Sequence, residues 1–235
     1  MKYRNPERSR ASNRKTIGVL ALQGDVKEHL FAIERCGMDA LEIKYERQLD
    51  CLDGLIIPGG ESTTIARLKD MTAGNLLDSI RRLGEAGFPI YGTCMGTIML
   101  ARKIIDSPLE LLALMDISVS RNAYGPQKAS FEADIDIPCL KELGAEELPF
   151  PAVFIRAPMV LSVKTGVEIL ARFEDAIVMA RQDNFLVTTF HPEITDDFRV
   201  HEYFAKMVNA DSLKSPQKKC DPVGERSQAI AQLRA

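Results

Sequence analysis

A single cysteine stands between two glycines in the stretch Gly92-Thr93-Cys94-Met95-Gly96, with an apolar run on each side. This spacing fits a nucleophile elbow with cysteine in place of serine, because glycines let neighbouring backbone pass close to a sharp strand-to-helix turn. The sulfur then points out of the sheet, and the amide of Met95 faces the place where an oxyanion forms. The alternative is a small buried cysteine in a tight crossover, and the elbow alone does not decide between the two.

A base and a residue to orient it occur later in the chain, in Phe190-His191-Pro192-Glu193. A nucleophilic thiol needs both. His191 follows a buried apolar run directly, so we expect it at the same sheet edge as Cys94, where open parallel sheets place their sites. The rigid Pro192 can aim the Glu193 carboxylate back at the imidazole. The sequence therefore predicts a Cys94, His191 and Glu193 triad.

A third candidate segment, PGGESTT, begins at Pro58 after another buried run. It is interpreted either as a turn with an N-cap from Ser62 or Thr63, or as part of the site. In the second case the amides of Gly59 and Gly60 complete the oxyanion hole, and Glu61 or Ser62 contacts polar groups of the substrate.

The remaining histidines and cysteines carry no such pattern. His29 and His201 fall in predicted helices beside acidic residues, and we interpret His29 as facing solvent or making a local contact. No C-x-x-C pair exists, which argues against structural zinc and a disulfide framework, so no metal is expected. The other cysteines are interpreted as packing residues at Cys36, Cys51 and Cys139 and as a tail thiol at Cys220.

The elements that must position these residues alternate through the first half of the chain. This alternation predicts βαβ units and a mostly parallel sheet. Strands are expected at 16–22, 40–43, 52–57 and 88–92, and helices at 25–37, 62–69, 76–86 and 95–103.

The second half has a period of two, which is typical of short antiparallel strands. A buried strand at 185–190 then delivers His191, and a helix is expected at 195–208. The fold class predicted is α/β, a three-layer and mostly parallel open sheet of flavodoxin-like type with antiparallel additions in the second half. We expect one domain over 16–210, a disordered extension at 1–15 and a flexible tail at 211–235. The period-two segments are 117–119, 131–135, 152–156, 160–163, 167–173 and 176–181.

Composition excludes several classes of partner. The chain has 235 residues, 27% of them charged, and a formal net charge of -3, so neither nucleic acid nor a membrane surface is indicated. No apolar run approaches the ~20 residues that span a membrane. The basic N-terminus lacks the apolar region of a secretory signal, which favours a cytoplasmic location.

Six motifs across the chain resemble the glutaminase subunit family of pyridoxal 5'-phosphate synthases, within the class I glutamine amidotransferases with a Cys-His-Glu triad. The resemblance runs from about Ile17 to about Val208, and the second-half motifs narrow it from the broader class to this family. In chain order the motifs are PGGEST, GTCMG, RNAYG, SFEADIDI, VFIRAP and TTFHPEITDD.

The resemblance implies a role for each triad residue. Cys94 attacks the side-chain amide of glutamine to form a γ-glutamyl thioester, His191 transfers protons, and Glu193 orients His191. Arginines also suit the carboxylate of a bound amino acid. The residues implied to contact glutamine are Gly60, Glu61, Ser62, Arg121, Ile155 and Arg156.

The resemblance also implies a partner and no cofactor. Ammonia passes to a separate synthase subunit, a (β/α)8 barrel that makes pyridoxal 5'-phosphate from a pentose phosphate and a triose phosphate. Met95 departs from the family, which usually has alanine there, and the larger side chain can alter the ammonia exit or the partner contact. The alternatives are another amidotransferase or a γ-glutamyl hydrolase on the same fold, and a non-catalytic subunit.

Overall fold

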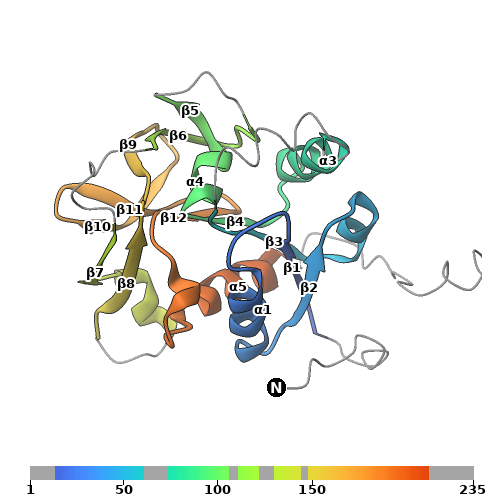
Figure 1. Ribbon diagram of the computed structural model, residues 1–235, viewed down its shortest axis with the longest axis horizontal. Helices are drawn as coiled ribbons and strands as arrows, with labels where there is room; N and C mark the ends of the chain where they lie inside the picture. Colours follow the sequence, from blue (N-terminus) through green and yellow to red (C-terminus); the bar gives the residue numbers. More distant parts are fainter. Residues whose placement is uncertain (1–13, 61–73, 106–110, 122–129, 144–147, 212–235) are drawn as a thin grey trace, which may run out of the picture.

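The computed structural model describes residues 14–60, 74–105, 111–121, 130–143 and 148–211 (Figure 1). Within these ranges, ten strands form one sheet and two more form a separate pair. The helix expected at 62–69 lies outside the described residues, as do residues 1–13 and 212–235. The domain boundaries therefore stay a prediction.

Five parallel strands form one half of the sheet, in the order β2-β1-β3-β4-β12. Numbered along the chain, this is the 2-1-3-4-5 order of flavodoxin-like folds, as the sequence predicts. The central strands are buried at nearly every position, which explains their continuous apolar runs. The bounds are β1 (Thr16–Leu20), β2 (Asp39–Ile43), β3 (Gly54–Ile57), β4 (Ile90–Thr93) and β12 (Phe185–Thr188).

The other half of the sheet continues from β12 through β11, β9, β6 and β5, while β10 pairs with β11. The pairings are antiparallel except for β5 with β6, so the predicted antiparallel additions are confirmed. Strands β7 and β8 form the separate antiparallel pair. The bounds are β5 (Ala101–Ile104), β6 (Met115–Ser120), β7 (Ser130–Ile135), β8 (Phe150–Ile155), β9 (Met159–Val163), β10 (Glu168–Phe173) and β11 (Ala176–Gln182).

Helices cover both faces of the parallel half and complete three layers. Helices α1 and α5 lie side by side on one face and share a buried apolar cluster with β7 and β8 (Figure 1). Helices α3 and α4 pack on the other face, in a second cluster. The bounds are α1 (Val26–Arg35), α3 (Gly74–Glu85), α4 (Met95–Leu100) and α5 (Arg199–Asp211), with 3-10 turns η2 (Glu46–Cys51), η4 (Pro138–Leu143) and η5 (Pro192–Ile194).

Two predicted helices have wrong boundaries. The helix expected at 95–103 ends at Leu100, and 101–104 form β5, because this short apolar stretch fits either structure and pairing with β6 decides. The helix expected at 195–208 begins only at Arg199. The Asp197 carboxylate accepts the backbone N–H of Arg199 at 3.1 Å, which sets the start of the helix there.

One cysteine prediction is also wrong. Cys36, Cys94 and Cys139 are not in disulfides, but Cys51 takes part in one. Wide spacing along the sequence does not show which thiols meet in the fold, so a packing role could not be assigned to Cys51 from spacing alone.

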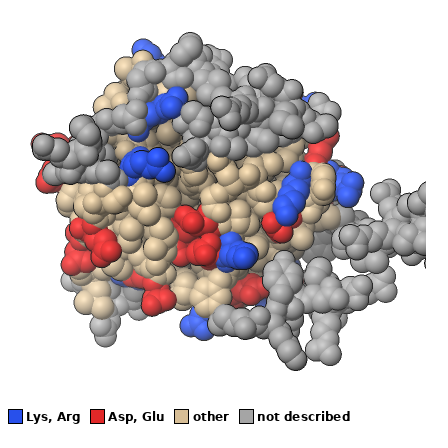
Figure 2. Space-filling model, in the orientation of Figure 1, with Lys and Arg blue, Asp and Glu red and all other residues tan. Residues whose placement is uncertain are grey.

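The described surface carries both signs of charge. On the face shown in Figure 2, acidic and basic side chains both occur among uncharged residues, and neither sign covers the described part of that face. None of the helices in the described ranges has the length and apolar character needed to cross a membrane.

Candidate active site

Cys94 lies on a strained turn between β4 and α4, near the centre of the parallel half of the sheet. Its φ of 47° and ψ of -105° are unusual for a residue with a side chain. A Cβ on Gly96 would lie 2.1 Å from the Ile57 carbonyl oxygen, and one on Gly92 would lie 2.6 Å from the Gly96 carbonyl oxygen. Both glycines are therefore required by close backbone approach, as the elbow pattern predicts.

His191 lies beside Cys94 on a loop after β12. Its backbone N–H donates to the Val153 carbonyl at 2.8 Å, which fixes the loop against β8. Gly59 packs closely against the side chains of both His191 and Cys94. A Cβ there would be 2.5 Å from Cε1 of His191 and 3.3 Å from Cβ of Cys94. The glycine after β3 thus lets the imidazole and the thiol sit next to each other.

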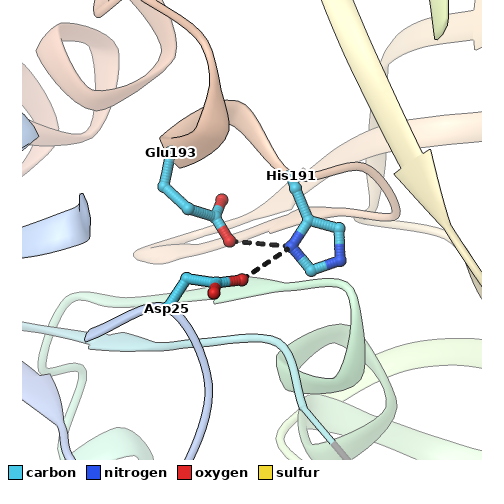
Figure 3. A group of neighbouring side chains, drawn as sticks. All are labelled: Asp25, His191 and Glu193. Carbon is cyan, nitrogen blue, oxygen red and sulfur yellow. Dashed lines mark hydrogen bonds and ion pairs between the residues drawn. The ribbon is translucent and has the colours of Figure 1, made fainter. Parts of the chain in front are cut away.

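Glu193 forms a hydrogen bond with the His191 ring. Its Oε1 accepts from Nδ1 of His191 at 2.8 Å, and the Nε2 atom points away from the carboxylate (Figure 3). Pro192 begins the η5 turn that folds Glu193 back toward the ring. Burial raises the pKa of Glu193, yet electrostatic attraction and hydrogen bonds from His29 and His191 outweigh burial and hold that pKa far below its ordinary value.

The charge state of His191 follows from the same neighbours. Burial lowers the pKa of this imidazole, but hydrogen bonds to Cys94 and Glu193, together with the negative charges of both, raise it to about 10. The ring is therefore cationic at neutral pH. An imidazolium next to Cys94 stabilises negative charge on the sulfur and has a proton to give to a leaving group.

Asp25 is a site residue that the sequence reasoning missed. It follows β1, and its Oδ2 lies 3.7 Å from Nδ1 of His191 (Figure 3). Burial and the charge of Glu193 raise the pKa of Asp25 above its ordinary value. The available signal was its position after a buried strand at the point where the strand order reverses.

Asp25, His191 and Glu193 place ligand-type atoms within 4.8 Å of one another, which is the spacing of a cation site. The imidazole, however, has both nitrogens protonated at neutral pH, and Nδ1 donates to Glu193. A protonated ring has no lone pair to offer a metal. The trio fits an oriented acid and base better than a metal centre.

The glycine loop differs in part from the expectation. The Gly59 amide donates to Oγ1 of Thr93 at 3.1 Å, so the expectation that it lines the oxyanion hole is wrong. Gly60 has a φ of 144° and packs against the Gln23 side chain. Glu61 and Ser62 lie outside the described residues.

Met95 is buried in the apolar cluster with α3 and α4. Its side chain therefore packs inside this subunit and offers no surface to a partner. Its backbone begins α4, where the first amides of a helix have no partner within the helix. An oxyanion role for this amide remains compatible with the turn.

The other expected substrate residues lie on two different strands. Ile155 ends β8, and its carbonyl oxygen lies 3.8 Å from the Cys94 sulfur. Arg156 follows with a φ of 44°, so the strand turns sharply beside the thiol. Arg121 follows β6, and three strands separate β6 from β4 in the sheet. The structure thus brings Ile155 to the thiol and places Arg121 after a more distant strand.

His29 and His201 are not surface residues. Their exposed fractions are 0% and 2%, so the expectation that His29 faces solvent is wrong. Helices α1 and α5 turn these side chains toward the sheet, and the two imidazoles meet there. Neighbouring acidic residues along the sequence suggested exposure, whereas packing of the two helices decides burial.

Three comparisons describe what this chain is similar to. Residues 19–210 match the sequence profile of the SNO glutamine amidotransferase family. The chain is 52% identical over 192 residues to "Pyridoxal 5'-phosphate synthase subunit PdxT" of Moorella thermoacetica, covering 82% of this chain and 98% of the relative. The Geobacillus kaustophilus protein of the same description is 47% identical over 202 residues, with 86% and 99% covered. A crystal structure of a glutamine amidotransferase superposes with a TM-score of 0.74 at 42% identity, covering 82% and 98%.

Proposed function

The chain belongs to the SNO glutamine amidotransferase family, and from that premise we propose that it hydrolyses L-glutamine to L-glutamate and ammonia for the synthesis of pyridoxal 5'-phosphate. One observation carries the proposal. A strained cysteine, a histidine against it and a buried glutamate meet at the ends of adjacent parallel strands. The relatives described as subunits of pyridoxal 5'-phosphate synthase supply the pathway.

The first half of the reaction forms a thioester. The Cys94 sulfur attacks the side-chain amide carbon of glutamine, and the amide oxygen takes the negative charge of the tetrahedral intermediate. The backbone amides of Gly60 and Met95 stabilise that oxyanion. His191 gives its proton to the amide nitrogen, the carbon–nitrogen bond breaks, and ammonia leaves.

The second half releases glutamate. His191, now neutral, takes a proton from a water molecule, and the resulting hydroxide attacks the thioester carbon. The carbon–sulfur bond breaks and glutamate departs, leaving Cys94 and a protonated His191. Glu193 holds the ring in the orientation that both steps require, since its carboxylate accepts from Nδ1 throughout.

Binding of the amino acid is assigned to residues around the thiol. Ile155 is supported by the approach of its carbonyl to the sulfur, and Arg156 by its position next to it. Arg121 completes the set as a partner for the substrate carboxylate. The full set proposed for glutamine is Gly60, Glu61, Ser62, Arg121, Ile155 and Arg156.

The partner is a synthase subunit that receives the ammonia, proposed to be a (β/α)8 barrel in a hetero-oligomer with this chain. The basis is the description of the relatives as synthase subunits, together with their coverage, at 98% and 99%, by this chain. We also propose that glutaminase activity is low until the partner docks, and the cytoplasmic location stays a prediction.

The test measures glutamate release from free glutamine, with and without the synthase subunit, for wild type, Cys94→Ala and Cys139→Ala. Cys139 is a half-buried thiol in η4 outside any disulfide and serves as the matched control. We expect wild type and Cys139→Ala to be active with the partner and Cys94→Ala to lose at least about a thousandfold. Hydrolysis of γ-glutamyl peptides instead of glutamine would favour a γ-glutamyl hydrolase.

A further inference from the structure

All three histidines of the chain belong to one buried cluster, and the proposed chemistry uses only His191. Nδ1 of His29 lies 3.0 Å from Nε2 of His201. On its other side, Nε2 of His29 lies 3.4 Å from Oε1 of Glu193 and 3.3 Å from Oγ1 of Thr93. A chain of contacts therefore runs from Cys94 inward through His191, Glu193 and His29 to His201.

The proton position on His201 follows from its surroundings. Burial, as the largest cause, lowers the pKa of His201 to about 3, so the ring is neutral and carries one N–H. Its Nδ1 is buried without a hydrogen-bond partner among the described residues. An orphaned N–H is rarer than an orphaned acceptor, so Nδ1 keeps the lone pair and the proton sits on Nε2.

The proton position on His29 follows from that of His201. The Nε2–H of His201 points at Nδ1 of His29, which must accept it and therefore carries no proton. The proton of His29 is then on Nε2. This N–H faces the Glu193 carboxylate and the Thr93 hydroxyl, both of which can accept it.

We propose that His29 is a positioning residue for the reaction, whose Nε2–H holds the Glu193 carboxylate while His201 fixes the His29 ring. The inference rests on the proposed function. Oε1 of Glu193 accepts from His191 and lies 3.4 Å from Nε2 of His29, and Oε2 has no hydrogen-bond partner in the described part of the chain. Removing His29 leaves His191 as the remaining donor near this carboxylate and lets it rotate.

Thr93 extends the effect of His29 to the nucleophile. Its hydroxyl contacts His29 and accepts from the Gly59 amide, and Gly59 packs against His191 and Cys94. Thr93 also immediately precedes Cys94 on β4. His29 therefore contacts both Glu193, which orients His191, and Thr93, which directly precedes the Cys94 nucleophile.

The first test reads the tautomers directly. In wild-type full-length chain labelled with 15N-histidine, three imidazoles give long-range 1H–15N correlations, assigned with His29→Gln and His201→Gln. At neutral pH we expect His201 to be neutral with its proton on Nε2, His29 to carry a proton on Nε2, and His191 to carry both protons. A His29 ring with its proton on Nδ1 alone would overturn the proposal, because Nε2 would then have no proton to offer the Glu193 carboxylate.

The second test separates positioning from packing by kinetics of the complex with the synthase subunit. His29→Leu removes the donor, whereas the amide nitrogen of His29→Gln occupies about the place of Nε2. We expect kcat for glutamine hydrolysis to fall about 10- to 100-fold in His29→Leu with KM nearly unchanged, and to recover to within about fivefold of wild type in His29→Gln. Equal losses in both variants, or no loss in His29→Leu, would overturn it.

A matched control addresses loss of stability. Ile33→Val removes a methyl group from a buried residue of α1, one turn beyond His29, and should leave kcat within about twofold.

Failure of the proposed function is recognised separately. Wild type would then release no glutamate with its partner, while the tautomer measurement, which needs no substrate, still decides the hydrogen bonding of His29.

Discussion

His191 contacts Glu193 directly, whereas His201 reaches it only through His29; both are almost fully buried, with exposed fractions of 5% and 2%. Their pKa values nevertheless move in opposite directions. Burial, as the largest cause, lowers the pKa of His201 to about 3. Burial also lowers that of His191, but hydrogen bonds and charges of Cys94 and Glu193 raise it to about 10.

The difference shows that burial does not set the role of a histidine in this site. A direct carboxylate neighbour and an adjacent thiol make His191 a proton donor at neutral pH, whereas His201 faces another imidazole and stays neutral. Glu193 contacts His191 directly and lies near His29, the neighbour of His201, so changes at and around this carboxylate test the comparison best.

The largest effect is expected from removing the negative charge of Glu193. Glu193→Gln should make His191 resemble His201, because burial would then lower the His191 pKa with less opposition. We expect kcat for glutamine hydrolysis to fall about 10²- to 10⁴-fold, as when the orienting carboxylate of a triad is neutralised. The measurement is the pH dependence of kcat with the His191 15N shifts, and an unchanged His191 pKa would contradict the account.

The next effect concerns stability and tests whether buried His201 is neutral in the native protein. Below its ordinary pKa of 6.5 the unfolded chain protonates His201, whereas the native protein does so only near pH 3. His201 therefore makes the free energy of unfolding decrease as pH falls from 6.5 toward 3, by up to about 1.4 kcal/mol per pH unit.

His201→Gln keeps a donor toward His29 but cannot titrate, so its free energy of unfolding should depend less steeply on pH between 4.5 and 6.5. Urea unfolding at several pH values measures both slopes. Equal slopes in wild type and variant would show that His201 is protonated in the native protein. The window avoids Glu193, whose ordinary pKa is 4.5 and which is lowered further in the fold.

The smallest effect is expected at the second carboxylate near His191. Asp25 lies 3.7 Å from Nδ1, against 2.8 Å for Glu193, and its side chain is 44% exposed. Asp25→Asn should change kcat by less than about fivefold, since an exposed charge at this distance is screened by solvent. A loss of a hundredfold or more in steady-state kinetics would mean that Asp25 shares the orienting role of Glu193.

Much of the architecture could be predicted, because parallel strands are buried on both faces and leave continuous apolar runs. The order of Cys94, His191 and the glycine loop along such runs was enough to expect them at one sheet edge. The short helix α4 could not be bounded in the same way. Its apolar stretch continues into β5, and pairing with a strand distant in sequence ends the helix.

The sequence by itself determined the chemistry of Cys94, His191 and Glu193, because a cysteine between glycines and a His-Pro-Glu turn are local patterns whose geometry follows from a few bonds. Only the tertiary structure decided the arrangement of His29 and His201. His29 and His201 are 172 residues apart and look like ordinary helical residues until α1 and α5 pack on the same face of the sheet. Burial, proton position and the contact with Glu193 all depend on that packing, which no short stretch of sequence encodes.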